Sequence, residues 1–242
     1  MSELIVDGAD NGVVVVTLNR PRARNALSLS LREELLGELV RLQGDDSVGA
    51  IVLTGSDPAF CAGMDTKELE RDPASIHTIG PRYRPLFESR KPVIGAINGA
   101  AMAGGLELAL ACDWLIASDA AVFADGHTRL GLTPGWGLTV LLAEAVGTRR
   151  ARQLITTGLP MDAETALHWG LVSEVVPHAD LLPRAREFGR AIVSNDPDAV
   201  ARVLETFSQQ RSIADSAAWA VEARHWREAS GVRSTQSNQA ES

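Results

Sequence analysis

The fold is decided by residues 92–109, whose sequence is PVIGAINGAAMAGGLELA. The first part, from Pro92 to Asn98, is apolar and bounded by turn residues, which is typical of a buried strand. A glycine-rich turn follows, and the leucine-rich end predicts a helix from about Gly105 to Ala111. At such a strand–turn–helix junction the first N–H groups of the helix are free to face an anion.

Two known anion-binding motifs do not fit this turn. Gly99 and Gly104 have the spacing of a phosphate-binding P-loop, but Gly105 and Leu106 stand where that motif requires Lys and Ser or Thr. The Gly-x-Gly-x-x-Gly spacing of a dinucleotide site is also absent from the turn. What remains is a helix start whose N–H groups could stabilise an oxyanion.

Glu107 is a charged residue in an otherwise apolar helix start, between Leu106 and Leu108. One explanation is structural, because the helix dipole stabilises an acidic side chain in the first turn. The other is catalytic, because a carboxylate in an apolar pocket has a raised pKa and is suited to proton transfer. The local sequence leaves both explanations open.

The chain on either side of this stretch alternates strands with helices. Strands are predicted at 13–19, 50–55, 114–117, 121–124 and 172–176. Ser28 or Ser30 can cap a helix with Glu33 as the second member of a capping box, and its apolar stripe is Leu31, Leu35, Leu39 and Leu42. A loop over 56–65 leads to a short helix from Thr66. The alternation predicts an α/β fold with a largely parallel sheet that is covered on both faces.

The C-terminal part is predicted to be helical at 179–193, 198–209 and 213–229. The last of these helices has a large apolar content, so we expect it either to pack back on the core or to form a subunit interface; the residues are Ala217, Trp219, Ala220, Ala223 and Trp226. Residues 234–242 are polar, and we expect this tail to be disordered. The predicted organisation is therefore a core over 1–176, a helical region over 177–233, and the tail.

Composition narrows the class of protein. The chain has 242 residues, 45% of them apolar, and a net charge of −8 from 23 basic and 31 acidic residues. These values predict a globular protein of one large domain with an appendage, and such acidity disfavours binding to nucleic acid or to an anionic membrane.

Cys61 and Cys112 form no Cys-x-x-Cys pair, and the N-terminal residues do not resemble a secretory leader, so we expect a reducing, cytoplasmic location. The five histidines form no close pair, so we expect no metal site built from neighbouring residues of the sequence.

A second loop changes the interpretation of the glycine-rich turn. Residues 57–69 are DPAFCAGMDTKEL, which taken alone is a strand-to-helix connection capped by Asp65 or Thr66. Together, FCAGMD at 60–65 and AGGLELA at 103–109 resemble the crotonase superfamily, the enoyl-CoA hydratase/isomerase family. That family's pattern has Phe-x-Ala-Gly-x-Asp and, later, Gly-Gly-Gly-x-Glu-Leu-Ala. Further matches, such as LNRP at 18–21 and RNAL at 24–27, extend the resemblance over about residues 12–176.

The resemblance implies a fold and a ligand. The family's fold is a ClpP-like spiral of ββα turns, followed by a helical region that forms trimers, often as dimers of trimers. Its ligand is an acyl-CoA thioester, with coenzyme A as part of the substrate and no permanently bound cofactor. By position, the backbone N–H groups of Met64 and Gly104 would form the oxyanion hole. Coenzyme A would lie along five residues, of which Arg24 and Lys67 are the candidates for its phosphates: Arg24, Ala26, Ala62, Asp65 and Lys67.

One residue departs from the hydratases of that family. They use two glutamates, one at the position of Glu107 and one 20 residues later, where this chain has His127. His127 could replace the second glutamate, since imidazole titrates near neutral pH. Asp125 could enter the site if its segment loops, although it would point to the opposite face in an extended strand. Alternatively, Glu107 works alone in another reaction. Trp136 lines the acyl pocket or is part of the core.

Three functions follow as hypotheses. The first is an enoyl-CoA hydratase, which adds water to a 2-enoyl-CoA through an enolate. The second is an isomerase or another enolate reaction, such as hydrolysis or decarboxylation, because the second glutamate is missing. The third is a non-catalytic acyl-CoA binding protein, against which the buried position expected for Glu107 argues.

Overall fold

The computed structural model describes residues 2–8, 10–71 and 89–229. Six of its strands form one sheet, in the order β1 (Leu4–Val6), β2 (Val13–Leu18), β3 (Ala50–Gly55), β5 (Val93–Ile97), β7 (Trp114–Ser118) and β10 (Glu174–Val176). Only β1 runs antiparallel to its neighbour, and the other strands are parallel. The predicted, largely parallel sheet is confirmed.

A smaller sheet contains β4 (Ala59–Cys61), β6 (Ala100–Met102), β8 (Val122–Ala124) and β9 (Met161–Asp162), in that order. Strands β4, β6 and β8 directly follow β3, β5 and β7 of the larger sheet, so each of these three turns of the chain adds one strand to both sheets. The helices α2 (Thr66–Arg71) and α4 (Gly104–Leu110) come after β4 and β6. The predicted spiral of ββα turns is therefore present.

Three short strands were not predicted. β4 lies inside the segment expected to be a loop, β6 lies inside the glycine-rich turn, and β9 lies at Met161–Asp162, where no strand was expected. Each has two or three residues, which is too short to show an alternating pattern of apolar and polar residues. Their pairing depends instead on strands that are distant in the sequence.

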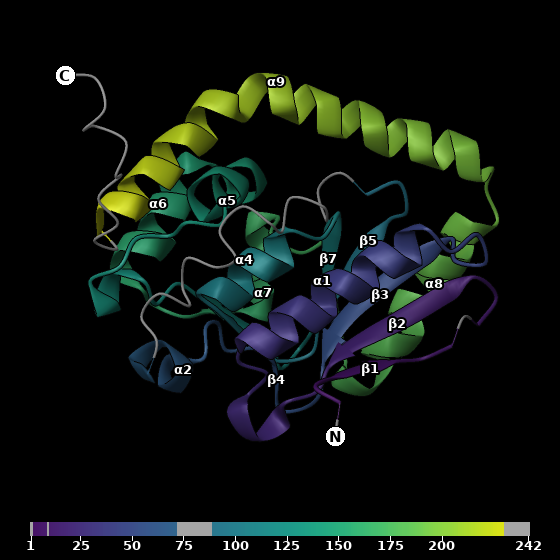
Figure 1. The fold of residues 1–242 in the computed structure, drawn as a ribbon, viewed down its shortest axis with the longest axis horizontal. Helices are drawn as coiled ribbons and strands as arrows, with labels where there is room; N and C mark the ends of the chain where they lie inside the picture. The colour runs from purple at the N-terminus through teal and green to yellow at the C-terminus, as the bar shows by residue number, and fades with distance from the viewer. Residues whose placement is uncertain (1, 9, 72–88, 230–242) are drawn as a thin grey trace, which may run out of the picture.

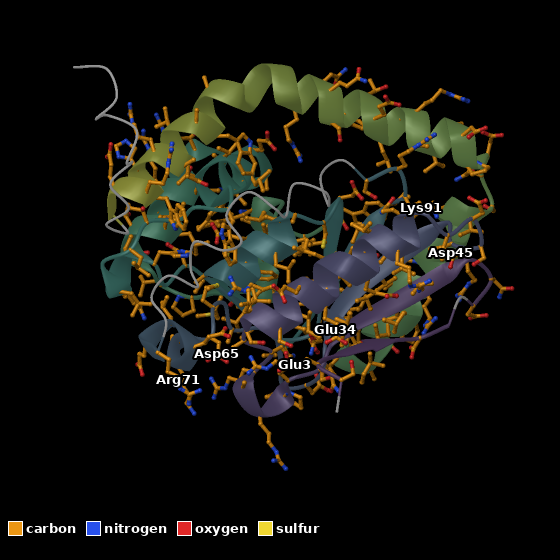
Figure 2. The ribbon with its side chains drawn as sticks, viewed as in Figure 1. Glu3, Glu34, Asp45, Asp65, Arg71 and Lys91 are labelled. Carbon is orange, nitrogen blue, oxygen red and sulfur yellow. The ribbon has the colours of Figure 1, made fainter. Side chains whose placement is uncertain are left out.

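The two faces of the six-stranded sheet are covered by different helices. Alternate residues such as Val13 and Val15 pack with Leu181 and Ala185 of α8 (Leu181–Val193). The opposite face packs against α1 (Leu29–Gln43), whose predicted stripe is buried: Leu31, Leu35, Leu39 and Leu42. At the end of α1, Figure 2 shows Lys91 close to Asp45, where the ammonium donates to the carbonyl oxygen of Asp45.

Of the two predicted caps of α1, Ser28 is the one used. Its hydroxyl oxygen accepts a hydrogen bond from the N–H of Leu31 at 3.1 Å. The prediction that Glu33 completes the capping box was wrong, because with Ser28 as the cap Glu33 lies beyond the third helical position. The carboxylate of Glu68 in α2 instead accepts from the N–H of Leu29, the first residue of the helix, at 2.7 Å. The N-terminus of α1 is thus capped partly by another helix.

The described α-helices after α4 are α5 (Leu138–Val146), α6 (Thr148–Thr157), α7 (Ala163–Trp169), α8 and α9 (Pro197–Ala229). The helices predicted at 198–209 and 213–229 are one continuous helix, because nothing after Pro197 breaks it: no glycine or further proline occurs before its end. Figure 1 shows α9 crossing the top of the molecule and then turning down over α5 and α6. The expected tail over 234–242 lies outside the described residues.

Of the two alternatives for the last helix, packing back on the core is observed. Trp219 packs against the core cluster, and Glu222 is buried. Ala217 and Ala220 lie on its exposed side. The face of α9 that carries Trp219, Glu222 and Trp226 is therefore the one turned toward α5.

Ala103, immediately before α4, has a backbone conformation that L-residues rarely adopt, with φ 47° and ψ −116°. A Cβ atom is strained there, whereas glycine is not. We expect Ala103→Gly to raise the free energy of unfolding by about 1 kcal/mol, which corresponds to about 2–4 °C in Tm. Calorimetry would measure this. Ala120→Gly is the control, because its φ is ordinary and the same change should lower Tm; a lower Tm for Ala103→Gly would contradict the strain.

Candidate active site

Two backbone N–H groups from neighbouring loops border one small space. They belong to Met64, which follows β4, and to Gly104 at the start of α4. A Cβ atom placed on Gly104 would lie 3.6 Å from the nitrogen of Met64, and one on Gly63 would lie 3.3 Å from the nitrogen of Gly104. Neither N–H donates a hydrogen bond to any acceptor in the described part of the chain. An oxyanion hole requires two unpaired donors side by side, so the proximity of these two N–H groups supports the predicted one.

Glu107 lies one helical turn further along α4 and is buried, with only 3% of its surface exposed. Its Oε1 accepts hydrogen bonds from the N–H groups of Trp136 at 2.9 Å and Gly135 at 3.3 Å. Burial raises the pKa of this carboxyl from 4.5 to about 7, although His127 and the hydrogen bond from Trp136 act in the opposite direction. Such a group exchanges a proton readily near neutral pH.

His127 faces Glu107 from the loop after β8. Its Nε2 lies 3.8 Å from Oε2 of Glu107, and its Nδ1 lies 2.6 Å from Oδ1 of Asp125. A carboxylate only accepts hydrogen bonds, so Nδ1–H donates to Asp125 and Nε2 is turned toward Glu107. Burial lowers the pKa of His127, but the hydrogen bond to Asp125 and the charge of Glu107 outweigh it and raise the pKa above its ordinary value.

Asp125 enters this cluster because the chain does not continue as a strand. β8 ends at Ala124, and the turn that follows lets Oδ1 of Asp125 accept from both the ring and the N–H of His127, the latter at 3.2 Å. Of the two placements considered from the sequence, the looped one is observed. Oδ2 of Asp125 is buried and has no hydrogen-bond partner among the described residues. Glu107, His127 and Asp125 thus form a line of three titratable groups.

Trp136 lies between these features. It is buried, with 6% of its surface exposed, and its ring carbon Cζ3 would be 3.0 Å from a Cβ atom on Gly104. Its backbone N–H holds Glu107. Trp136 is therefore a core residue whose ring lies beside Gly104, and its role as a wall of the acyl pocket stays a prediction.

The residues expected along coenzyme A come from two segments that pair with each other. The N–H of Ala62 donates to the carbonyl of Arg24 at 3.0 Å, and the N–H of Asp65 donates to that of Leu27 at 3.3 Å. This pairing brings four of the five together: Arg24, Ala26, Ala62 and Asp65. Lys67 follows in the first turn of α2, and the side chains of Arg24 and Lys67 are exposed.

The carboxylate of Asp65 has structural partners of its own. It forms an ion pair with Arg20 at 2.9 Å and caps α2 by accepting from the N–H of Lys67 at 3.1 Å. Burial opposes ionisation, but Arg20 and the capping bonds outweigh it and lower the pKa of Asp65. Figure 2 shows Asp65 beside α2, on the same side of the molecule as Arg71. Asp65 therefore fixes the loop that carries the N–H of Met64.

One buried carboxylate at this site was missed from the sequence. Glu222 of α9 has 6% of its surface exposed and accepts from the N–H groups of Gly137 at 2.6 Å and Thr139 at 2.7 Å. A signal was present: Glu222 lies three residues after Trp219 and four before Trp226, so it shares the apolar face of the helix. An acidic residue on such a face is buried only where donors meet it.

The described residues contain no group of three or more His, Cys, Asp or Glu side chains that could hold a metal ion. None of the described helices is both long and apolar enough to cross a membrane.

The chain matches one protein family over nearly its whole length. The family model described as enoyl-CoA hydratase/isomerase matches residues 8–240. A protein of Arabidopsis thaliana named probable enoyl-CoA hydratase 1, peroxisomal, is 37% identical over 199 residues, which are 79% of this chain and 73% of the relative.

Solved structures agree with these matches. An enoyl-CoA hydratase of Mycobacterium paratuberculosis superposes with a TM-score of 0.87 at 46% identity, over 94% of this chain and 97% of its own. A monofunctional enoyl-CoA isomerase from M. smegmatis superposes with a TM-score of 0.75 at 35% identity, over 86% of this chain and 93% of its own. The fold is therefore shared by a hydratase and an isomerase.

Proposed function

The chain belongs to the enoyl-CoA hydratase/isomerase family, the crotonase superfamily, and on this premise we propose that it adds water across the double bond of a 2-enoyl-CoA thioester. The observation that carries the proposal is the pair of buried Glu107 and half-buried His127, 3.8 Å apart, with Glu107 one helical turn after the unpaired N–H of Gly104. Hydration needs a base for water and an acid for the α-carbon, and this pair supplies both.

In the proposed hydration, Glu107 and His127 act at the two carbons of the double bond. Ionised Glu107 takes a proton from water, and the water oxygen forms a bond to the β-carbon of the substrate. The π electrons move to the thioester oxygen, where the N–H groups of Met64 and Gly104 stabilise the enolate. Protonated His127 gives its proton to the α-carbon, and the enolate returns to the thioester. Glu107 then holds a proton and His127 has lost one, so a transfer between them restores the starting state.

Asp125 supports His127 in this scheme. Its Oδ1 receives the Nδ1–H of the ring and so turns Nε2 toward Glu107, while its negative charge stabilises the imidazolium. An Asp–His pair therefore takes the place of the second glutamate. This is also the reason to prefer a hydratase over a reaction in which Glu107 works alone.

Other parts of the chain bind the substrate and assemble the subunits. Exposed Arg24 and Lys67 bind the phosphates of coenzyme A, which is part of the substrate, and no cofactor is held permanently. Residues 1–176 form the catalytic core and 177–233 the region that forms a homotrimer or a dimer of trimers. The protein acts in the cytoplasm, away from membranes and nucleic acid.

The pH dependence of activity tests His127. Glu107 and His127 share protons as a pair, so we expect kcat/KM to rise through the pKa of Glu107 of about 7 and to fall at higher pH when the pair loses its last proton. His127→Gln should lower kcat by about 100-fold and remove the fall. Its acid limb should also move to higher pH, because the histidine charge lowers the pKa of Glu107.

The assay follows the loss of conjugated thioester absorbance with crotonyl-CoA, and His168→Gln, an exposed histidine on α7, is the control. An unchanged profile in His127→Gln would contradict the role of His127. Conversion of a 3-enoyl-CoA into the conjugated isomer without hydration would assign the alternative, an isomerase. Saturable binding of the acyl-CoA with no turnover of either substrate would assign the non-catalytic alternative.

A further inference from the structure

A short backbone segment, Gly-Trp-Gly at residues 135–137, binds Glu107, and we call it the strap. The strap is bound in turn by α9. The N–H groups of Gly135 and Trp136 donate to Oε1 of Glu107 on one side. The next N–H, that of Gly137, donates to Oε1 of Glu222 at 2.6 Å on the other side. Two buried carboxylates therefore hold three consecutive peptide N–H groups.

Glu222 also caps the helix that continues from the strap. α5 begins at Leu138, and its own cap residue, Gly137, has no side chain to accept from the first N–H groups. Glu222 accepts from the N–H of Thr139 at 2.7 Å, and the hydroxyl of Thr139 donates to the same carboxylate oxygen. All three bonds fix the position of Gly137 and Thr139 relative to α9.

Two tryptophans of α9 pack against the same strap. A Cβ atom on Gly135 would lie 2.7 Å from Nε1 of Trp226, and one on Gly137 would lie 2.9 Å from Cζ2 of Trp219. These close approaches require glycine at both positions. Trp219, Glu222 and Trp226 thus form one face of α9 that fits the strap on which Glu107 depends.

We propose that Glu222 is a positioning residue for Glu107, because it fixes the strap whose two preceding N–H groups orient the Glu107 carboxylate. Glu222 touches neither the expected substrate nor the reacting atoms, so its effect passes through Glu107. The inference rests on the proposed function only for the activity measurements described below.

The charge of Glu222 gives a second, independent effect on Glu107. The groups that face Glu107 are His127 and Asp125 from the loop after β8 and Glu222 from α9. A buried negative charge nearby disfavours a second one, so Glu222 contributes to the raised pKa of Glu107. A neutral residue at 222 therefore lowers the pKa of Glu107.

Glu222→Gln tests both effects, because the amide oxygen can still accept from Gly137 while the charge is removed. We expect the acid limb of kcat/KM to move to lower pH by about 0.5–1 unit, and kcat to fall about 10-fold with KM within about twofold of wild type. Glu228→Gln is the matched control, since it removes the same charge from the exposed side of α9 and should change neither quantity.

Infrared pH-difference spectra separate this inference from the proposed function, because they need no substrate. Glu107→Gln assigns the Glu107 carboxyl band in the wild type, and the midpoint of that band should be lower in Glu222→Gln than in wild type or Glu228→Gln. Equal midpoints would overturn the effect of charge even if the protein is an active hydratase. A shifted midpoint in a protein without hydratase activity would support the inference and contradict the proposed function.

Thr139→Ala provides a test that does not alter charge. It removes one hydrogen bond to Glu222 and leaves the carboxylate in place, so kcat should fall about threefold while the pH profile stays fixed. Circular dichroism and Tm confirm that each variant is folded. Wild-type kcat in both Thr139→Ala and Glu222→Gln would overturn the positioning role.

Discussion

Glu107→Gln is expected to lower kcat/KM by about 10²–10⁴-fold for hydration of crotonyl-CoA. The amide has the size of the carboxyl and can still accept from the N–H groups of Gly135 and Trp136, so the strap should keep its position. What is lost is the group whose pKa of about 7 lets it take a proton from water near neutral pH. The rate of absorbance loss at saturating and at low substrate measures both kcat and KM.

The control for this variant is stability as a function of pH. Burial raises the pKa of Glu107 above its unfolded value, so the folded state binds more protons and stability is lost as pH rises from 4.5 to about 7. A neutral glutamine avoids this loss, and Tm of the variant at pH 8 should equal or exceed that of wild type. Glu164→Gln, an exposed residue of α7, should leave activity unchanged. Full activity in Glu107→Gln would exclude Glu107 as the base.

Gly105→Ala should lower the free energy of unfolding by at least about 3 kcal/mol, or about 6–12 °C in Tm. α4 lies against β4 so closely that a Cβ atom on Gly105 would overlap the carbonyl oxygen of Cys61 and lie 2.8 Å from its carbonyl carbon. Backbone cannot move aside as a side chain can. Either the spacing between α4 and β4 must increase or the fold must give way, and denaturant unfolding measures the cost.

Gly104→Ala is the matched comparison for stability, one residue earlier in the same turn. Its Cβ atom would meet Cζ3 of Trp136 at 3.0 Å, a side chain that can shift by a few tenths of an ångström. We therefore expect a much smaller loss of stability than in Gly105→Ala, by about 2 kcal/mol or more. Equal losses in the two variants would contradict the close approach of α4 to β4.

Five strands of the six-stranded sheet and the α1 helix could be predicted because their patterns are local, whereas β1 (Leu4–Val6) was not predicted. Val13 to Leu18 and Ala50 to Gly55 are apolar runs of strand length, and the leucine stripe of α1 has helical spacing. In the smaller sheet only β8 was predicted, at 121–124. The strands β4, β6 and β9 are too short to have a pattern, and their pairing is set by the spiral as a whole.

The residues of the candidate site that lie in recognisable sequence motifs could be predicted. The loops that carry Met64 and Gly104 and the pair of Glu107 and His127 follow from the sequence and its resemblance to a family. The partner of His127 did not, because the orientation of Asp125 depends on a turn after β8. Glu222 was missed for a related reason: its partners are 85 and 83 positions away in the sequence.

The same separation has a consequence for synthesis of the chain. Domains form from the N-terminus as the polypeptide leaves the ribosome. The strap at 135–137 is synthesised well before Glu222, which lies in the last helix described. A nascent or prematurely terminated chain that lacks α9 would hold Glu107 but not the residue that fixes its support. Full support of Glu107 is thus reached only when α9 has been made.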